Sequence, residues 1–185
     1  MKRFLPVLAV LLLLFGLAPH PVLSASQKAE AGVLAAQAIP LKRIDWRHIL
    51  SGEINGQGQA TGFHYAGVDF VPRSARVVKA GKPDANGIVR AKIEVFDPKS
   101  GQWIAKKSES TLYPAAWTRA QLESEVEAAY KAAKLTRRLD GGSWGWRGLS
   151  PSGVTIQGVV DGDGAVRTAY PIRSREISKA PLSNP

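Results

Sequence analysis

The stretch GIVRAKIEVFDPKSGQWIAKK, residues 87–107, predicts a β-hairpin. Val89, Ala91, Ile93 and Val95 are apolar and alternate with charged side chains, which is the pattern of a strand with one buried face. The segment DPKSG that follows contains residues typical of a turn, and QWIAKK supplies the returning strand. This hairpin indicates an antiparallel sheet.

A second hairpin and one long helix lie further along the chain. VTIQGVVDGDGAVRTAYPI (154–172) predicts two strands joined by DGDG. WTRAQLESEVEAAYKAAKL (117–135) has apolar residues at helical spacing, and Thr118 with Gln121 forms a capping box at its start. The helix therefore separates the two hairpins in sequence.

The remaining segments are assigned from local signals. We expect short helices over 27–38 and 44–53, an extended segment over 63–72, and a glycine-rich loop over 137–148 (RRLDGGSWGWRG). The order is N-terminal helices followed by antiparallel β-sheets with one central helix. That order predicts the α+β fold class.

The N-terminus has the features of a secretory signal peptide. Lys2 and Arg3 precede an apolar run, and small residues near Ser24 offer a cleavage site. We predict a signal peptide over 1–25 and a secreted or periplasmic protein with no stable membrane insertion after cleavage. An uncleaved anchor is the alternative, but the run is shorter than the ~20 residues that span a bilayer comfortably.

The rest of the chain is expected to form one domain. We assign a helical lead-in to 26–43, the domain to 44–174 and a flexible tail to 175–185. The sequence contains no cysteine, so the core must hold the fold without disulfides. The chain carries 25 Lys and Arg against 15 Asp and Glu. Such a charge favours polyanionic partners, although solubility alone would also explain it.

The segment RHILSGEINGQGQATGFHYAG, residues 47–67, contains His48 and His64, while the third histidine, His20, lies in the predicted leader. The sequence has no GxSxG motif, no cysteine nucleophile, no phosphate-binding glycine motif and no histidine pair at metal-binding spacing. What remains is a pair of histidines able to act as acid and base.

Such a pair is what cleavage of RNA by its own 2′-hydroxyl requires. One imidazole removes the proton from the hydroxyl, and the other gives a proton to the departing 5′-oxygen. A nearby lysine would stabilise the added negative charge. The residues alone leave open that both histidines are structural.

Four segments, in order, resemble the bacterial EndoU endoribonuclease family. They are HILSGE, GQATGFH, EVFDPKSGQWIAKKSESTLYPAAWTRAQL and VTIQGVVDGDGAVRTAYPI. The resemblance covers Trp46 to Ile172. It implies a fold of the barnase–EndoU–colicin–RelE type, with antiparallel sheets and helices on their outer sides.

The resemblance also implies catalytic residues. His64, in Gly-Phe-His, matches the family's general base, and His48, before Gly-Glu, matches its general acid. The family's lysine matches either Lys106 or Lys107. A four-residue spacing to Ser110 favours Lys106 and the same spacing to Thr111 favours Lys107, and of the two we prefer Lys107.

Thr168 and Tyr170 match the Thr-x-Tyr that the family places against the scissile nucleotide, and Thr111 is a further candidate for substrate binding. Tyr170 could instead be a half-buried strand aromatic. Glu53 could hydrogen-bond a histidine or the backbone, and we interpret it as structural. Trp144 and Trp146 would be either stacking surfaces for RNA or core residues.

The function implied is a secreted, metal-independent endoribonuclease that acts on single-stranded RNA at uridylates. It would leave 2′,3′-cyclic phosphate and 5′-hydroxyl ends, need no cofactor, bind no metal and act as a monomer. The alternatives are a basic envelope protein that binds anionic polymers without cleaving them, and a toxin used against competitors. An immunity protein is then a candidate partner.

Overall fold

The structure is a computed structural model that describes residues 39–177. The predicted signal peptide and the helix expected over 27–38 lie outside the described residues. Within them the protein combines antiparallel sheets with a few helices, so the predicted α+β class is confirmed. No helix of the described part is long and apolar enough to cross a membrane.

The larger sheet has five strands in the order β1-β11-β10-β9-β8. Its strands are β1 (Arg43–Ile44), β8 (Lys134–Arg138), β9 (Trp144–Leu149), β10 (Thr155–Val160) and β11 (Ala165–Pro171). β1 runs parallel to β11, and the other neighbours are antiparallel. The hairpin predicted over 154–172 is confirmed as β10 and β11.

The glycine-rich loop predicted over 137–148 is wrong, because most of this segment lies in strands β8 and β9. Gly148 of this segment serves packing between the sheet and a helix. A Cβ on Gly148 would lie 1.9 Å from the carbonyl oxygen of Ala129 in the helix behind the sheet. A glycine that permits close helix–sheet approach has the same local sequence signal as a turn glycine.

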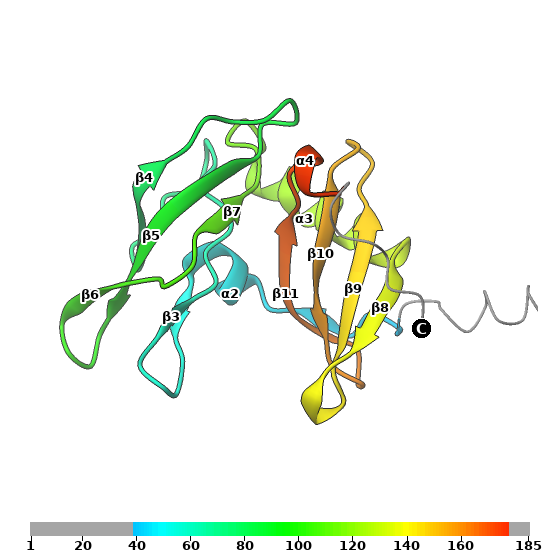
Figure 1. Ribbon diagram of the computed structural model, residues 1–185, viewed down its shortest axis with the longest axis horizontal. Coiled ribbons are helices and arrows are strands. Elements are labelled where there is room, and N and C mark those ends of the chain that lie inside the picture. The colour runs from blue at the N-terminus through cyan, green and yellow to red at the C-terminus, as the bar shows by residue number, and fades with distance from the viewer. Residues whose placement is uncertain (1–38, 178–185) are drawn as a thin grey trace, which may run out of the picture. The chain divides into compact units, whose positions relative to one another are not determined.

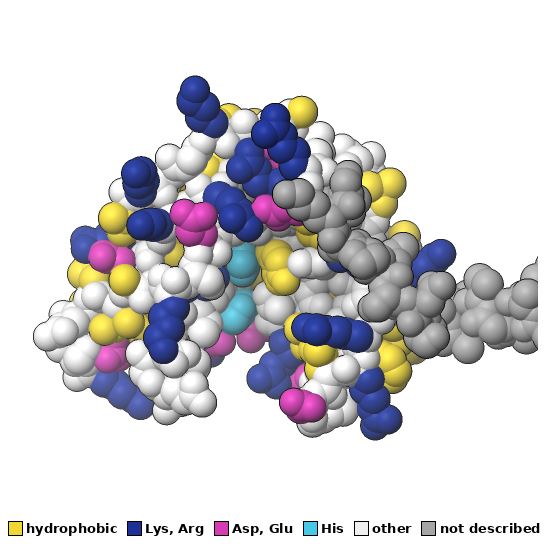
Figure 2. Space-filling view, viewed as in Figure 1, with side chains coloured by type: hydrophobic (Ala, Val, Ile, Leu, Met, Phe, Trp, Pro, Cys, Tyr) yellow, Lys and Arg dark blue, Asp and Glu magenta, His cyan; other side chains and the backbone are white. Residues whose placement is uncertain are grey.

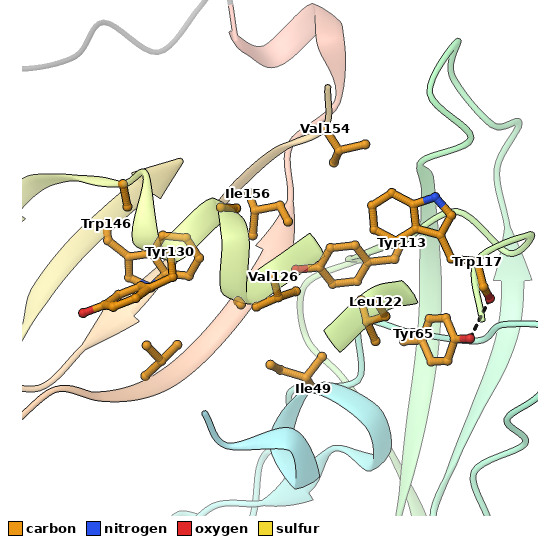
Figure 3. Close-up of a cluster of buried hydrophobic side chains, with 14 of the residues drawn as sticks. Ile49, Tyr65, Tyr113, Trp117, Leu122, Val126, Tyr130, Trp146, Val154 and Ile156 are labelled. Carbon is orange, nitrogen blue, oxygen red and sulfur yellow. Dashed lines mark hydrogen bonds between the residues drawn. The ribbon is translucent and has the colours of Figure 1, made fainter. Parts of the chain in front are cut away.

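That helix is α3 (Arg119–Lys131), as predicted over 117–135 but shorter at both ends. Thr118 caps it by accepting a hydrogen bond from the Gln121 amide. Its buried face covers the sheet and forms much of the main core (Figure 3). Trp146 lies there edge-on to Tyr130, with ring centroids 5.1 Å apart, so Trp146 is a core residue and offers no surface to RNA.

The second sheet contains the hairpin predicted over 87–107. Its strands are β4 (Ala75–Ala80), β5 (Val89–Asp97), β6 (Gln102–Ala105) and β7 (Ser110–Leu112). β5 pairs with all three others. Ala91, Ile93 and Val95 are buried, which confirms the predicted alternation. β4 has one buried residue and an otherwise exposed face, and sequence periodicity did not reveal it.

A short helix and a small hairpin lie between the two sheets (Figure 1). These are α2 (Trp46–Ser51), β2 (Glu53–Ile54) and β3 (Ala60–Thr61). α2 lies within the range 44–53 expected to be helical and contacts β11, and β2 contacts β5. The segment expected to be extended over 63–72 forms no strand. At the other end, α4 (Ser174–Ile177) gives the expected tail one helical turn at its start, and residues beyond 177 lie outside the described part.

The chain after β3 folds back onto the carbonyl end of α2. The Phe63 amide donates to the His48 carbonyl at 2.9 Å, and the His64 amide donates to the Ile49 carbonyl at 2.7 Å. Gly62 makes this approach possible. Its φ is +72°, and a Cβ there would lie 2.2 Å from the carbonyl oxygen of His48.

Gly58 offers a matched control, because its φ is also +72° but nothing lies within 4 Å of its missing Cβ. We expect Gly58→Ala to lower the free energy of unfolding by the left-handed backbone cost alone, about 1–2 kcal/mol. Gly62→Ala should lose about 1–3 kcal/mol more through the steric clash. Urea unfolding of both variants measures the difference, and equal losses would show that the close approach is not needed.

Candidate active site

His48 is held in place both through its backbone amide and through its ring. Asp45, which precedes α2, accepts a hydrogen bond from the His48 amide at 3.0 Å and caps the helix. On the side chain, Nδ1 lies 3.0 Å from Oε1 of Glu53. The other carboxylate oxygen of Glu53 accepts a hydrogen bond from Arg47 at 2.7 Å. Because a carboxylate only accepts, Nδ1 carries hydrogen and Nε2 is the nitrogen left for chemistry.

Glu53 therefore contacts a candidate catalytic residue directly. The sequence offers this contact as one option but gives no reason to prefer it over a structural role for Glu53. The link depends on Gly52, which has a φ of +64° and turns the chain from α2 into β2. A glutamate five residues after a histidine has no fixed relation to it until that turn is known.

His64 lies where the two cores meet. Its neighbour Phe63 packs in the core of the second sheet, and its other neighbour Tyr65 packs in the main core. The hydroxyl of Tyr65 donates to the Trp117 carbonyl at 2.7 Å (Figure 3). These two anchors fix the backbone of His64. The residue His64 itself is only 6% exposed.

The ring of His64 is oriented by the backbone of β7. Nδ1 lies 2.9 Å from the carbonyl oxygen of Thr111, so Nδ1 carries hydrogen and Nε2 has the free lone pair. Burial, and after it the nearby Lys106 ammonium, lowers the pKa of His64 from its usual range to about 3. The ring is therefore neutral at ordinary pH, the form a general base needs.

The two imidazoles and one tyrosine lie side by side. The His48 and His64 ring centroids are 6.3 Å apart, and Tyr170 of β11 stacks on His64 with centroids 5.2 Å apart. In Figure 2 the two histidines lie together in a hollow in the middle of the view, with Lys and Arg side chains above them. The sequence placed these three residues in one site, and the structure brings them together.

The structure brings Lys106 to this site, and Lys107 does not line it. Nζ of Lys106 donates to Ser110 Oγ at 2.7 Å and to the Gly62 carbonyl at 3.1 Å. Lys107 is exposed. The preference for Lys107 therefore does not agree with the geometry: in β6 and the turn after it, the side chain at 106 points inward and its neighbour points out.

The sequence does not identify Ser110 as a residue of the site. It is buried, and its hydroxyl lies 3.2 Å from the carbonyl oxygen of Gly62 while also contacting Lys106. In the sequence, Ser110 only marks a four-residue spacing that favours Lys106. Burial lowers the pKa of Lys106 to about 8, so the ammonium still predominates at pH 7.

The threonines differ in what they contribute. Thr111 lines the cleft and its carbonyl oxygen orients His64. Thr168 is partly exposed on the same side of β11 as Tyr170, while Ala169 is buried, which matches the predicted alternation. Thr168 lines an adjoining hollow that shares His48 with the cleft, so it lies beside the histidine pair and not between its rings.

The cleft has a volume of about 450 Å³. It is lined by side chains of both sheets, of two helices and of the connecting segments, among them His48, His64, Lys106, Thr111, Gln157, Tyr170, Arg90, Glu109 and Glu176. Arg90 pairs with Glu176 at 2.9 Å at its rim. No group of three or more His, Cys, Asp or Glu within residues 39–177 could hold a metal ion.

The low pKa of His64 makes stability depend on pH. The unfolded chain binds a proton at this histidine below about 6.5, while the folded chain does not until about 3. The free energy of unfolding should therefore fall as pH drops below 6.5, by at most ~1.4 kcal/mol per pH unit. We expect His64→Asn to remove this contribution between pH 8 and 5. Urea titrations of both proteins test it, and parallel curves over that range would contradict the buried neutral histidine.

Comparison with known proteins identifies the family of the chain. The family described as Bacterial EndoU nuclease matches residues 43–173. A curated Bacillus cereus protein named "Toxin" is 29% identical over 128 residues, which cover 68% of this chain and 22% of that protein. The chain thus corresponds to about a fifth of the length of this relative. No solved structure was found to match. Since the family match extends over most of the chain and includes every residue of the cleft named above except Glu176, the protein belongs to the bacterial EndoU nuclease family.

Proposed function

We propose that this protein is an exported endoribonuclease that cuts single-stranded RNA after uridylates. The 2′-hydroxyl of the RNA attacks the adjacent phosphate and leaves a 2′,3′-cyclic phosphate and a 5′-hydroxyl. One observation carries the proposal: two imidazoles in one cleft have Nδ1 engaged by different acceptors, so both Nε2 atoms are left for the substrate.

His64 has the properties of the base. Its neutral ring presents a lone pair on Nε2, because Nδ1–H is held by the Thr111 carbonyl. Burial keeps a proton from occupying that nitrogen in the resting protein. His64 would take the proton of the 2′-hydroxyl as the oxygen attacks phosphorus.

His48 has the partner that an acid needs. Glu53 faces its Nδ1 as an ion-pair partner whenever the ring is protonated, and a carboxylate so placed holds the imidazolium in position. His48 is also the more exposed of the two rings, with 17% of its side chain accessible, so it can regain its proton from water after giving it to the 5′-oxygen.

Lys106 would stabilise the charge that builds up on the phosphate. Two of its three ammonium hydrogens are used by Ser110 and Gly62, and the third is available to a non-bridging oxygen. The partly buried setting strengthens this interaction relative to water. No metal is required in this scheme, since the nucleophile belongs to the substrate.

Tyr170 and Thr168 would hold the nucleotide on the 5′ side of the cut. Tyr170 offers a ring edge and a hydroxyl beside His64, and Thr168 lies two residues away on the same strand face. The preference for uridine is carried over from the family resemblance. The excess of Lys and Arg over Asp and Glu would attract the strand from a distance.

The biological role is proposed from the same relative. The Bacillus cereus protein is named a toxin, so we propose that this nuclease acts on RNA of competing cells after export through its N-terminal leader. A small acidic immunity protein that covers the cleft would then protect the producer.

Substitution of the proposed catalytic residues, with Lys107 as a matched control for Lys106, gives the first test. A fluorescent oligonucleotide with a single uridine should be cut in the presence of EDTA, and the same oligonucleotide with deoxyuridine should not. His48→Ala, His64→Ala and Lys106→Ala should each lower kcat by about 10²–10⁴-fold, while Lys107→Ala should leave it unchanged. Binding of RNA without cleavage, or a loss with Lys107→Ala equal to that with Lys106→Ala, would contradict the proposed mechanism.

The dependence of the cleavage rate on pH above 7 gives the second test. Since burial lowers the pKa of Lys106 to about 8, its charge is lost as pH rises through that value. Lys106→Arg keeps its charge at all these pH values. The ratio of the Lys106→Arg rate to the wild-type rate should therefore rise between pH 7 and 9.5. A ratio that does not change with pH would show that the lysine charge does not limit the rate.

A further inference from the structure

Three polar side chains form a row across the five-stranded sheet, next to the histidine pair. Arg147 of β9, Gln157 of β10 and Tyr170 of β11 are register partners on neighbouring strands. Arg147 donates a hydrogen bond to Gln157 Oε1 at 3.1 Å, and Gln157 Nε2 donates to the Tyr170 hydroxyl oxygen at 3.0 Å. The row ends at His64, on which Tyr170 stacks.

Arg147 fixes the orientation of the Gln157 amide. A guanidinium has only hydrogen-bond donors, so the atom of Gln157 that faces it must be the carbonyl oxygen. A flipped amide would set N–H against N–H at that contact. Arg147 is partly buried and forms no ion pair within residues 39–177. Gln157 is therefore its side-chain partner, and the amide NH₂ is directed at Tyr170.

The consequence for Tyr170 concerns its hydroxyl hydrogen. The phenol oxygen accepts from Gln157, whose nitrogen has no lone pair to receive a hydrogen bond in return. A phenol O–H prefers to lie in the plane of its ring, where it has two orientations. The O–H of Tyr170 therefore takes the orientation that points away from Gln157. Tyr170 and Gln157 both line the cleft with His48 and His64, so the hydrogen is available to a bound substrate.

We propose that Gln157 and Arg147 are positioning residues that hold the Tyr170 hydroxyl as a hydrogen-bond donor to a non-bridging oxygen of the scissile phosphate. This inference rests on the proposed ribonuclease function. Negative charge grows on that oxygen as the 2′-hydroxyl attacks, so a donor already aimed at it acts in the transition state more than in the ground state. The effect should therefore appear in kcat and not in KM.

Gln157→Glu reverses the hydrogen bond with little change in shape. A glutamate still accepts from Arg147, but it also accepts from Tyr170 and so turns the phenol hydrogen away from the substrate. We expect Gln157→Glu and Tyr170→Phe each to lower kcat for a uridine oligonucleotide by about tenfold. In the Tyr170→Phe background, Gln157→Glu should leave kcat unchanged. The negative charge of the glutamate repels RNA in both backgrounds, and this repulsion should raise KM.

Gln157→Met is the uncharged control. It removes the amide but adds no acceptor, so the Tyr170 hydroxyl is no longer held in place but is not turned away from the substrate either. We expect kcat to fall by about threefold, which is less than the loss from Gln157→Glu. If Gln157→Glu does not fold, Arg147→Met tests the same idea by releasing the amide to flip. It should lower kcat in the Tyr170 background and not in the Tyr170→Phe background, and urea unfolding checks that each variant is folded.

Two results would overturn the inference. One is an equal loss of kcat from Gln157→Glu with and without the Tyr170 hydroxyl, since the residue would then act through charge or packing. The other is a loss from Gln157→Met as large as that from Gln157→Glu. A wild-type protein that does not cut the oligonucleotide refutes the ribonuclease proposal itself, which is a separate outcome.

Discussion

Two hydrogen bonds between backbones, from Phe63 to the His48 carbonyl and from His64 to the Ile49 carbonyl, hold the site together. They join the end of α2 to the segment after the β2–β3 hairpin, and each histidine lies at or next to one of these bonds. Gly62 is the residue that allows the two backbones to come this close. The histidines are sixteen residues apart in sequence, and this contact brings their rings into one cleft.

The contact is maintained by packing on both sides. Phe63 has a φ of +59°, a left-handed conformation that a bulky residue adopts only when its surroundings compensate. Its amide is hydrogen-bonded and its side chain is buried in the core of the second sheet, while Tyr65 is buried in the main core. The stability of both cores thus holds His64 in the position where it is neutral and faces His48.

Periodicity in the sequence predicted the two hairpins and the long helix well, but the structural roles of the glycines in 137–148 were predicted poorly. Alternation in 87–107 and 154–172 identified both hairpins because each strand buries one face. Gly148 looks like a loop residue in the sequence, since its role in helix–sheet packing depends on α3, a separate element that local sequence signals do not reveal. The preference for Lys107 differs from the structure, which places Lys106 in the cleft, for a related reason. Adjacent residues leave a strand end in opposite directions, and spacing to a later threonine does not tell which one points inward.

The histidines are chemically alike in sequence and become different only through what accepts their Nδ1 hydrogen. For His48 it is a carboxylate close to solvent, and for His64 it is a backbone carbonyl in a buried setting beside an ammonium. A carboxylate tolerates the protonated ring and burial opposes it, so the acid and base roles that we propose follow from position in the fold. Because Glu53 belongs to the hairpin between the sheets, Thr111 to the second sheet and Tyr170 to the first, this difference exists only when both sheets have closed around α2.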